Sequence, residues 1–353
     1  MKQGALGKTV FFLVLVSLCV FCMSCDQEPL FYDIATGYPP IEPLIGGAPS
    51  KIVEYPSGSE TLYITNGIIS KYDSGSWTRM SNQPPVRTRD IAAVNGSPET
   101  LYALGVDGRI YSSTGGAWVG PIAVYEKIES IFGAGSALYA CRLTGTPGTN
   151  NGYTIYINGG SPISNTGKLM GAVVVSSTTY LGTLGAGLFT AAAPSTLIQE
   201  TVIGKEIIGL ATDNSDLFIA TPSKVHCLSG DVTLDSYAYS GGITVWDDGS
   251  NQLLLAGIRR SNSAFRYGYR EIMFSSSQRP QEPGNTVNTV TSVQKDSTYS
   301  AIGKHVVNHL YVVNNSSANN GGYPIIFAST AKDGLWSYKI RSNDKPPEWN
   351  GER

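Results

Sequence analysis

The sequence predicts an all-β fold, and within that class a β-propeller of seven blades. Charged residues make up only 15% of the chain, against roughly 25% in an average soluble domain, while Gly (40), Pro (19) and Tyr (20) are frequent. Short apolar segments alternate with glycine-centred turns, which is typical of strands joined by tight hairpins. A pattern of such segments repeats about every forty residues. These observations indicate strands and do not favour a long helical protein.

The repeat is clearest in the stretches that begin at Glu60, Glu99 and Thr178. Each reads as a strand, a turn containing glycine, a second strand, another turn and a short outer strand. An apolar residue recurs in the first of these strands, with spacings of 39, 37, 42, 37 and 37, at Leu62, Leu101, Leu138, Tyr180, Leu217 and Leu254. Spacing this even indicates one repetitive domain rather than two unrelated ones.

Further apolar runs lie between these segments and predict the innermost strand of each unit. They are residues 90–94, 128–134, 170–175, 207–212 and 242–246. A strand near a central axis is covered on both faces, which explains why these runs are continuously apolar or small. Four short strands per period of about forty residues are typical of a propeller blade. We expect Trp77 and Trp118 to lie at the outer strands of their blades and to pack over the next blade.

The number of blades is less evident than the repeat. After Leu254 the next obvious unit is 325–340, so either the sixth blade carries a long insertion or the last blade shares its register with Asn308–Asn315. We predict seven blades, with six or eight as alternatives. A β-helix or a pair of β-sandwiches is the alternative fold, although these would need a shorter period or no common period.

The start of the chain has the pattern of a signal peptide. Lys2 and Lys8 precede an apolar run, residues 10–23, that is too short to span a bilayer. The run ends in Cys22-Met23-Ser24-Cys25, which resembles the lipobox of bacterial lipoproteins in the relaxed form found in spirochaetes. The resemblance implies cleavage before Cys25 and a diacylglyceryl group on its sulfur. An ordinary secretory signal with chance cysteines is the alternative.

The chain is therefore expected to comprise a lipoprotein signal peptide (1–24), a proline-rich tether near the lipid (25–49) that could also complete the last blade, and the propeller (50–353). It resembles bacterial lipoproteins with a propeller domain, among them outer-membrane assembly lipoproteins and surface-exposed adhesins. That resemblance implies a location on the extracytoplasmic side of the cell envelope, and binding rather than catalysis. The implied partners are the membrane, through the N-terminal lipid, and an envelope protein or an acidic glycan. A net charge of −2 does not favour nucleic acid.

The remaining cysteines predict neither a disulfide nor a metal site. Cys141 and Cys227 fall in non-neighbouring repeats and are expected to be buried free thiols. Only His226, His305 and His309 could complement them, without the spacing of a zinc site. We expect no metal and no cofactor.

The candidate binding residues lie in long loops. In a propeller the loops from the second to the third strand and the links between blades lie on one face, where binding sites usually open. Residues 142–152, 258–268 and, in one register, 314–322 are long insertions of this kind. The second is the most distinctive, because planar guanidinium donors interleave with aromatic rings, which suits a phosphate, an acidic sugar or a protein. Its candidates are Arg259, Arg260, Phe265, Arg266, Tyr267, Tyr269 and Arg270.

Arg87, Arg89 and Arg142 would face the same side and extend this patch. The alternative for the whole group is a solvated hairpin whose aromatic rings pack on the neighbouring blade, with the other arginines as plain surface charges.

No catalytic motif is found, and the sequence does not predict an enzyme. A GxSxG elbow, an HExxH helix, a P-loop and a dinucleotide fingerprint are all missing from it. A carbohydrate-binding or carbohydrate-acting propeller is the alternative function, because Asp90, Asp213, Asp247 and Asp248 could approach the central channel as a carboxylate pair. The favoured function is a membrane-tethered scaffold that binds a partner through one face of the propeller.

Overall fold

The computed structural model describes residues 45–145, 152–164, 166–191, 197–200, 206–228, 230–232, 238–247, 252–259, 267–274, 301–313, 324–339 and 349–351. All of them belong to one compact unit, Glu42–Ser261 with Phe265–Arg353, which is described here by itself. The signal peptide, Cys25, and the tether up to residue 44 lie outside the described residues.

The unit consists of seven antiparallel sheets that follow one another along the chain. The first four sheets contain β1 (Val53–Glu54), β2 (Leu62–Thr65), β3 (Ile69–Asp73) and β4 (Ser76–Arg79); β5 (Thr88–Val94), β6 (Thr100–Gly105) and β7 (Ile110–Ser113); β8 (Ile128–Ala134), β9 (Ala137–Leu143), β10 (Tyr153–Ile157) and β11 (Ile163–Ser164); and β12 (Lys168–Val175), β13 (Thr178–Leu184), β14 (Gly187–Ala191) and β15 (Leu197–Glu200).

The last three sheets contain β16 (Gly209–Thr212), β17 (Leu217–Ala220), β18 (Val225–Cys227) and β19 (Gly230–Val232); β20 (Ala238–Asp247), β21 (Gln252–Arg259) and β22 (Tyr269–Phe274); and β23 (Val307–Val313), β24 (Ile325–Thr330), β25 (Leu335–Lys339) and β26 (Trp349–Gly351). A short 3-10 helix, η2 (Ala301–Lys304), precedes β23. In every sheet the strands pair in chain order, so each sheet is a simple meander.

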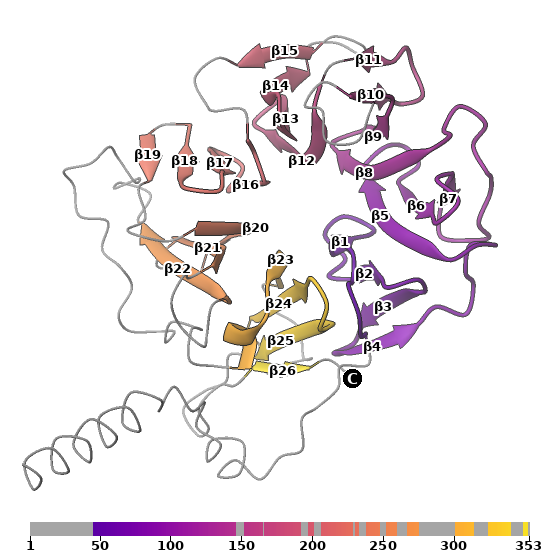
Figure 1. Ribbon diagram of the computed structural model, residues 1–353. Helices are drawn as coiled ribbons and strands as arrows, with labels where there is room; N and C mark the ends of the chain where they lie inside the picture. The colour runs from indigo at the N-terminus through magenta and orange to yellow at the C-terminus, as the bar shows by residue number, and fades with distance from the viewer. Residues whose placement is uncertain are drawn as a thin grey trace, which may run out of the picture. The chain divides into compact units, whose positions relative to one another are not determined.

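The sheets are the blades of a propeller, and the prediction of seven is confirmed (Figure 1). The first strand of each blade is adjacent to the first strand of the next, from β5 through β8, β12, β16 and β20 to β23. All the apolar residues that mark the repeat lie in the second strand of blades one to six, as predicted. The Asn308–Asn315 segment supplies the first strand of blade seven.

Two blades have three described strands instead of the predicted four. In blade two the fourth position is taken by Val119, which exchanges both backbone hydrogen bonds with Ser112 (2.8 and 2.9 Å). In blade six, the residues that follow β22 lie outside the described part of the chain up to η2.

Because the strands run alternately up and down, the turns of each blade fall on two faces. We call the face with the second-to-third-strand turns and the links between blades the linker face, and the other the hairpin face. The turn glycines of the linker face hold the next blade by backbone hydrogen bonds. Thr88 N donates to Gly67 O (3.1 Å) between blades one and two, and Ile128 N donates to Gly108 O (2.9 Å) between blades two and three.

The same contact closes the ring between the last blade and the first. Gly334 N donates to Gly47 O (2.8 Å) and Leu335 N donates to Ile45 O (2.9 Å), so residues 45–49 take the place of a link between blades. The sheet of blade seven is nevertheless built from C-terminal residues alone, and residues 45–49 add only an isolated bridge from Gly47 to Asp333. The N-terminal segment thus locks the last blade without supplying a strand to its sheet.

The core lies between neighbouring blades. Trp77 of blade one is 3% exposed and packs against Phe327 of blade seven, with ring centroids 5.5 Å apart. Trp118 of blade two packs on the cluster that contains Tyr63 and Ile69 of blade one. The expectation that these tryptophans cover the next blade is wrong, because both face the preceding one. Cys141 and Cys227 are buried free thiols, as predicted, and belong to blades three and five.

The three long insertions do not connect equivalent strands. Residues 142–152 and 258–268 join second to third strands, as expected. Residues 314–322 lie outside the described residues, between β23 and β24, the first and second strands of blade seven. The register in which they would join a second strand to a third is therefore not the one that the structure has.

Candidate functional site

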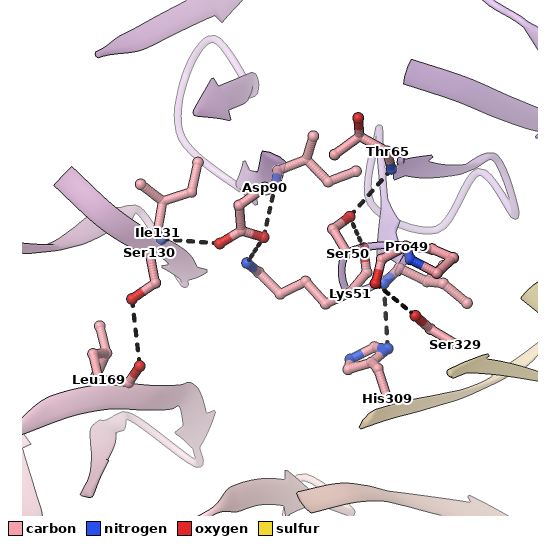
Figure 2. A network of polar contacts seen from close by, with 12 residues as sticks. Pro49, Ser50, Lys51, Thr65, Asp90, Ser130, Ile131, Leu169, His309 and Ser329 are labelled. Carbon is pink, nitrogen blue, oxygen red and sulfur yellow. Dashed lines mark hydrogen bonds and ion pairs between the residues drawn. The ribbon is translucent and has the colours of Figure 1, made fainter. Parts of the chain in front are cut away.

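A largely buried ion pair joins the N-terminal segment to blade two. Lys51 Nζ lies 2.5 Å from Asp90 Oδ1, and the two side chains are 13% and 14% exposed. Asp90 Oδ1 also accepts the N–H of Ile91 (2.9 Å), and Asp90 Oδ2 accepts the N–H of Ile131 in blade three (3.1 Å). Figure 2 shows the carboxylate between these donors. Both oxygens of Asp90 are therefore engaged in structural contacts.

The same segment contacts blades three and seven. The Lys51 ammonium lies 4.3 Å from the centroid of the Phe132 ring. Ile52 N donates to His309 Nδ1 (3.2 Å), and the Ser329 hydroxyl donates to Pro49 O (2.8 Å) (Figure 2). Four residues, Pro49 to Ile52, thus contact several blades at once.

Burial shifts the protonation equilibria of this cluster. Burial lowers the pKa of Lys51 from its usual value, although Asp90 opposes the shift. Burial, with a smaller effect of the nearby Lys51 charge, lowers the pKa of His309 to about 3. His309 is therefore neutral near pH 7. Because its Nδ1 accepts the hydrogen bond from Ile52 N, the single ring proton lies on Nε2.

A repeated irregularity at the start of the inner strands sets up these contacts. The register between first and second strand shifts by one residue at Arg89, Glu129, Met170 and Asn308. The residue after the shift then reaches the next blade: Asp90 to Ile131, Ser130 to Leu169 O (3.4 Å), and His309 to Ile52. A bulge of this kind redirects a side chain, and here it directs one across each of three blade junctions.

Glycine occupies the same position in blades four, five and six. A Cβ on Gly209 would lie 2.2 Å from the carbonyl oxygen of Gly241, and one on Gly171 would lie 3.2 Å from Cβ of Leu210. The inner strands approach too closely there for a side chain. At this position blades four and five carry no side chain, whereas beside the glycines of blade six the Ser240 hydroxyl donates to Val307 O of blade seven (2.8 Å).

The arginines predicted near blades two and three lie on the linker face, and two of them have structural partners. Arg89 is exposed, and its Nη2 donates to Ile128 O at the start of the next blade. Arg87 is exposed, and its guanidinium lies across the turn of blade one, where a Cβ on Gly67 would be only 2.8 Å from Nη2. Arg142 is half-buried at the end of β9, with its Nε buried and without a hydrogen-bond partner.

The blade-six candidates are only partly described. Arg259 is exposed at the end of β21, and Tyr267 is half-buried, with its N–H bonded to Gly303 O (2.9 Å). Arg270 is half-buried in β22. Outside the described residues lie Arg260, Phe265 and Arg266.

Tyr269 does not offer a surface for binding. It is 1% exposed and packs in the core between blades six and seven with Trp246 and Leu310. The interpretation of this aromatic ring as a platform is wrong, because β22 turns it toward the neighbouring blade.

The candidate arginines form two groups rather than one patch. Arg87, Arg89 and Arg142 belong to blades two and three and the link before them, whereas Arg259 and Arg270 belong to blade six. Exposed apolar residues stand at two turns of the linker face near the first group: Val106, 59% exposed, and Leu184, 38% exposed. The linker face therefore combines arginine with exposed apolar side chains.

The carboxylates considered for sugar chemistry lie at opposite ends of the inner strands. Asp90 is near the start of β5, on the linker face, whereas Asp213 follows β16 and Asp247 ends β20, on the hairpin face. Asp213 Oδ1 accepts the N–H groups of Ser215 (2.9 Å) and Asp216 (2.6 Å) and so stabilises a turn. An inner strand of about seven residues separates its ends by roughly 20 Å, which is too far for a carboxylate pair with Asp90. Asp248 lies outside the described residues.

Within the described part of the chain, no group of three or more His, Cys, Asp or Glu side chains could hold a metal ion. Among the same residues, no helix is long and apolar enough to cross a membrane.

Lys51 and His309 were not predicted from the sequence. Lys51 is the one charged residue between Glu42 and Glu54, and it stands just before an apolar segment, which is a detectable signal. His309 gives no such signal, because its role depends on the closure of the ring.

Comparison with solved structures supports the fold. The chain is similar to the GH74 enzyme of Niastella koreensis (TM-score 0.53, 16% identity, 88% of this chain and 55% of that one) and to the WD40 β-propeller domain of Doa1 (TM-score 0.50, 9% identity, 84% and 95%). It also resembles the extracellular domain of the putative hybrid two-component system BT4673 from B. thetaiotaomicron (TM-score 0.49, 12% identity), of which it spans 40%. No protein-family model and no curated protein matches the chain. The chain is a β-propeller protein, and likeness at this level of identity extends to the fold alone.

Proposed function

We propose that the chain is a lipid-anchored, extracytoplasmic scaffold that binds an envelope protein through the linker face of its propeller. The anchor is Cys25, whose surroundings resemble a lipobox. The binding face carries Arg87, Arg89 and Arg142 on one side and Arg259 and Arg270 on the other.

The observation that carries this proposal is the composition of the linker face. Arginine beside exposed apolar residues, here Val106 and Leu184, is typical of protein interfaces. The blades that present them are rigid, because their cores interlock with those of their neighbours, so little ordering is needed on binding.

The carboxylates favour binding over hydrolysis. Asp90 is held by Lys51 and by two backbone N–H groups, which leaves it a structural role. Asp213 stabilises a turn at the other end of the blades.

Cross-linking of the anchored protein in its own envelope, followed by identification of the captured protein, tests the proposal. The variant Arg259→Ser, Arg260→Ser, Arg266→Ser should lose the cross-linked partner while keeping the thermal midpoint of the parent. Lys71→Ser with Asp73→Ser, away from the linker face, is the control and should retain the partner. Equal capture by both variants would contradict the assignment of the face.

The anchor is tested separately. Cys25→Ser should leave the precursor unprocessed and without acyl mass; normal processing would instead indicate an ordinary secretory signal.

A further inference from the structure

Charge is divided between the two faces of the propeller. Exposed bases stand at the turns and links of the linker face in blades that lie on different sides of the ring, namely Arg87, Arg109, Lys127, Lys224, Arg259 and Lys332. That face also carries acidic residues, of which Asp107 accepts the Tyr111 hydroxyl (3.0 Å) and Asp333 contacts His305 Nδ1 (2.8 Å).

The hairpin face has the opposite character. Its described turns and the strand ends beside them carry exposed Asp73, half-buried Glu54, Glu60, Glu99 and Asp213, and buried Asp216. None of the described turns on this face contains a lysine or an arginine. The described bases are thus concentrated on the linker face, whereas the described turns of the hairpin face carry carboxylates as their only charged side chains.

The N-terminal segment reaches the ring on the basic side. Gly47 bridges to Asp333 in a turn of the linker face, and residues 45–49 run from there into β1. The described chain thus enters the propeller at its linker face.

We propose that the linker face rests on an anionic lipid surface. This inference relies on the proposed function only for the position of the anchor. Juxtamembrane bases gain about 1 kcal/mol each from anionic lipid, and a lipid anchor combined with a basic surface gives stable attachment. Val106 and Leu184 at the turn tips suit the boundary between headgroups and acyl chains. The acidic hairpin face is repelled from the same surface, which sets the orientation.

The spread of the bases favours a lipid surface over an acidic protein segment. Lys127, Lys224 and Lys332 belong to the link before blade three and to turns of blades five and seven, so a short peptide would not reach all of them. A planar surface can contact them together. Arg87 and Arg259 belong to both surfaces, so a protein partner bound by them would compete with the lipid for the linker face.

The test uses the chain from residue 25 onward with Cys25→Ser, which keeps every described residue and removes the lipid. Its co-sedimentation is measured with vesicles of phosphatidylcholine alone and of phosphatidylcholine with 30% phosphatidylglycerol, at low and high salt. We expect binding to the anionic vesicles only, weakened by salt because exposed charges are screened. Lys127→Gln, Lys224→Gln, Lys332→Gln should weaken it at least about tenfold.

The matched control makes the same change in net charge on the other face. Ser97→Glu, Ser136→Glu, Ser177→Glu places three charges in first-to-second-strand turns, at exposed positions. It should bind anionic vesicles within about twofold of the parent, since the linker face is untouched.

Two results would overturn the inference. One is a failure of the parent chain to bind anionic vesicles, including the case in which it captures an acidic protein instead. The other is equal weakening by both triple variants, which would mean that net charge alone matters. Because the vesicle assay lacks the anchor, its result is independent of whether Cys25 is acylated.

Discussion

The Lys51 ammonium lies 2.5 Å from the Asp90 carboxylate, so the segment before the first blade is bound to the inner strand of the second. Through Ile52 and Pro49 the same segment is bound to the last blade. The ring is closed by these side-chain and backbone contacts and not by a strand shared between the two ends of the chain.

Breaking this ion pair should destabilise the propeller. Lys51→Met leaves Asp90 buried without its counter-charge, and we expect a loss of about 3 kcal/mol in the free energy of unfolding by urea. The double variant Lys51→Met, Asp90→Asn should cost less than the sum of the single changes, because it leaves no unpaired charge. In the exposed pair Lys71–Asp73, 2.8 Å apart, Lys71→Met should cost less than about 1 kcal/mol. Equal losses for Lys51→Met and Lys71→Met would show that the buried pair has no special role.

Stability should fall as the pH is lowered below about 6.5. The pKa of His309 is about 3 in the folded protein, against 6.5 for an unperturbed histidine, so protons bind the unfolded chain first. The resulting loss develops between pH 6.5 and pH 3 and reaches at most about 5 kcal/mol. His309→Asn keeps an acceptor for Ile52 N without a titratable ring. Its stability should match the parent at pH 8 and depend less on pH below 6.5; an unchanged pH profile would contradict the role of His309.

The close approach of blades two and three should make Gly133 indispensable. A Cβ at this position would lie 1.7 Å from the carbonyl oxygen of Ala93, so neither strand could keep its place. Gly133→Ala should lower the free energy of unfolding by about 3 kcal/mol. Gly116→Ala, where nothing lies within 4 Å, is the control and should have almost no effect. A stable Gly133→Ala variant would mean that the inner strands can separate without penalty.

The thiol of Cys141 should be unreactive in the folded protein. It is 0% exposed, and burial raises its pKa to about 11, so little thiolate forms at pH 8. With Cys25→Ser in the chain from residue 25 onward, iodoacetamide should label neither Cys141 nor Cys227 until urea unfolds the protein, as read by mass. Labelling of Cys141 under native conditions would indicate local opening of blade three.

The period of the repeat and the identity of the inner strands follow from the sequence, which also predicted seven blades but left six or eight as alternatives. Leu62, Leu101 and Leu138 recur because each must fill the same space between blades, and a local pattern reveals a local requirement. The face of the long loops at 142–152 and 258–268 follows from the strand order in the same way.

The direction of a side chain within a repeat does not follow from such a pattern. Tyr269 and the tryptophans Trp77 and Trp118 were placed wrongly because a two-residue alternation allows either face, and only the neighbouring blade decides which is filled. The repeat is least regular in the last blade. Only the strand order of that blade shows that residues 314–322 do not join a second strand to a third.

By itself the sequence determined a β-propeller, because strand, turn and core requirements act within about forty residues, and the structure fixed the number of blades at seven. Only the tertiary structure decided that Lys51 meets Asp90, that His309 meets Ile52 across 257 positions, and that exposed bases from several blades gather at the turns and links of one face. These relations depend on the closure of the ring, which brings the two ends of the chain together and which no local pattern encodes.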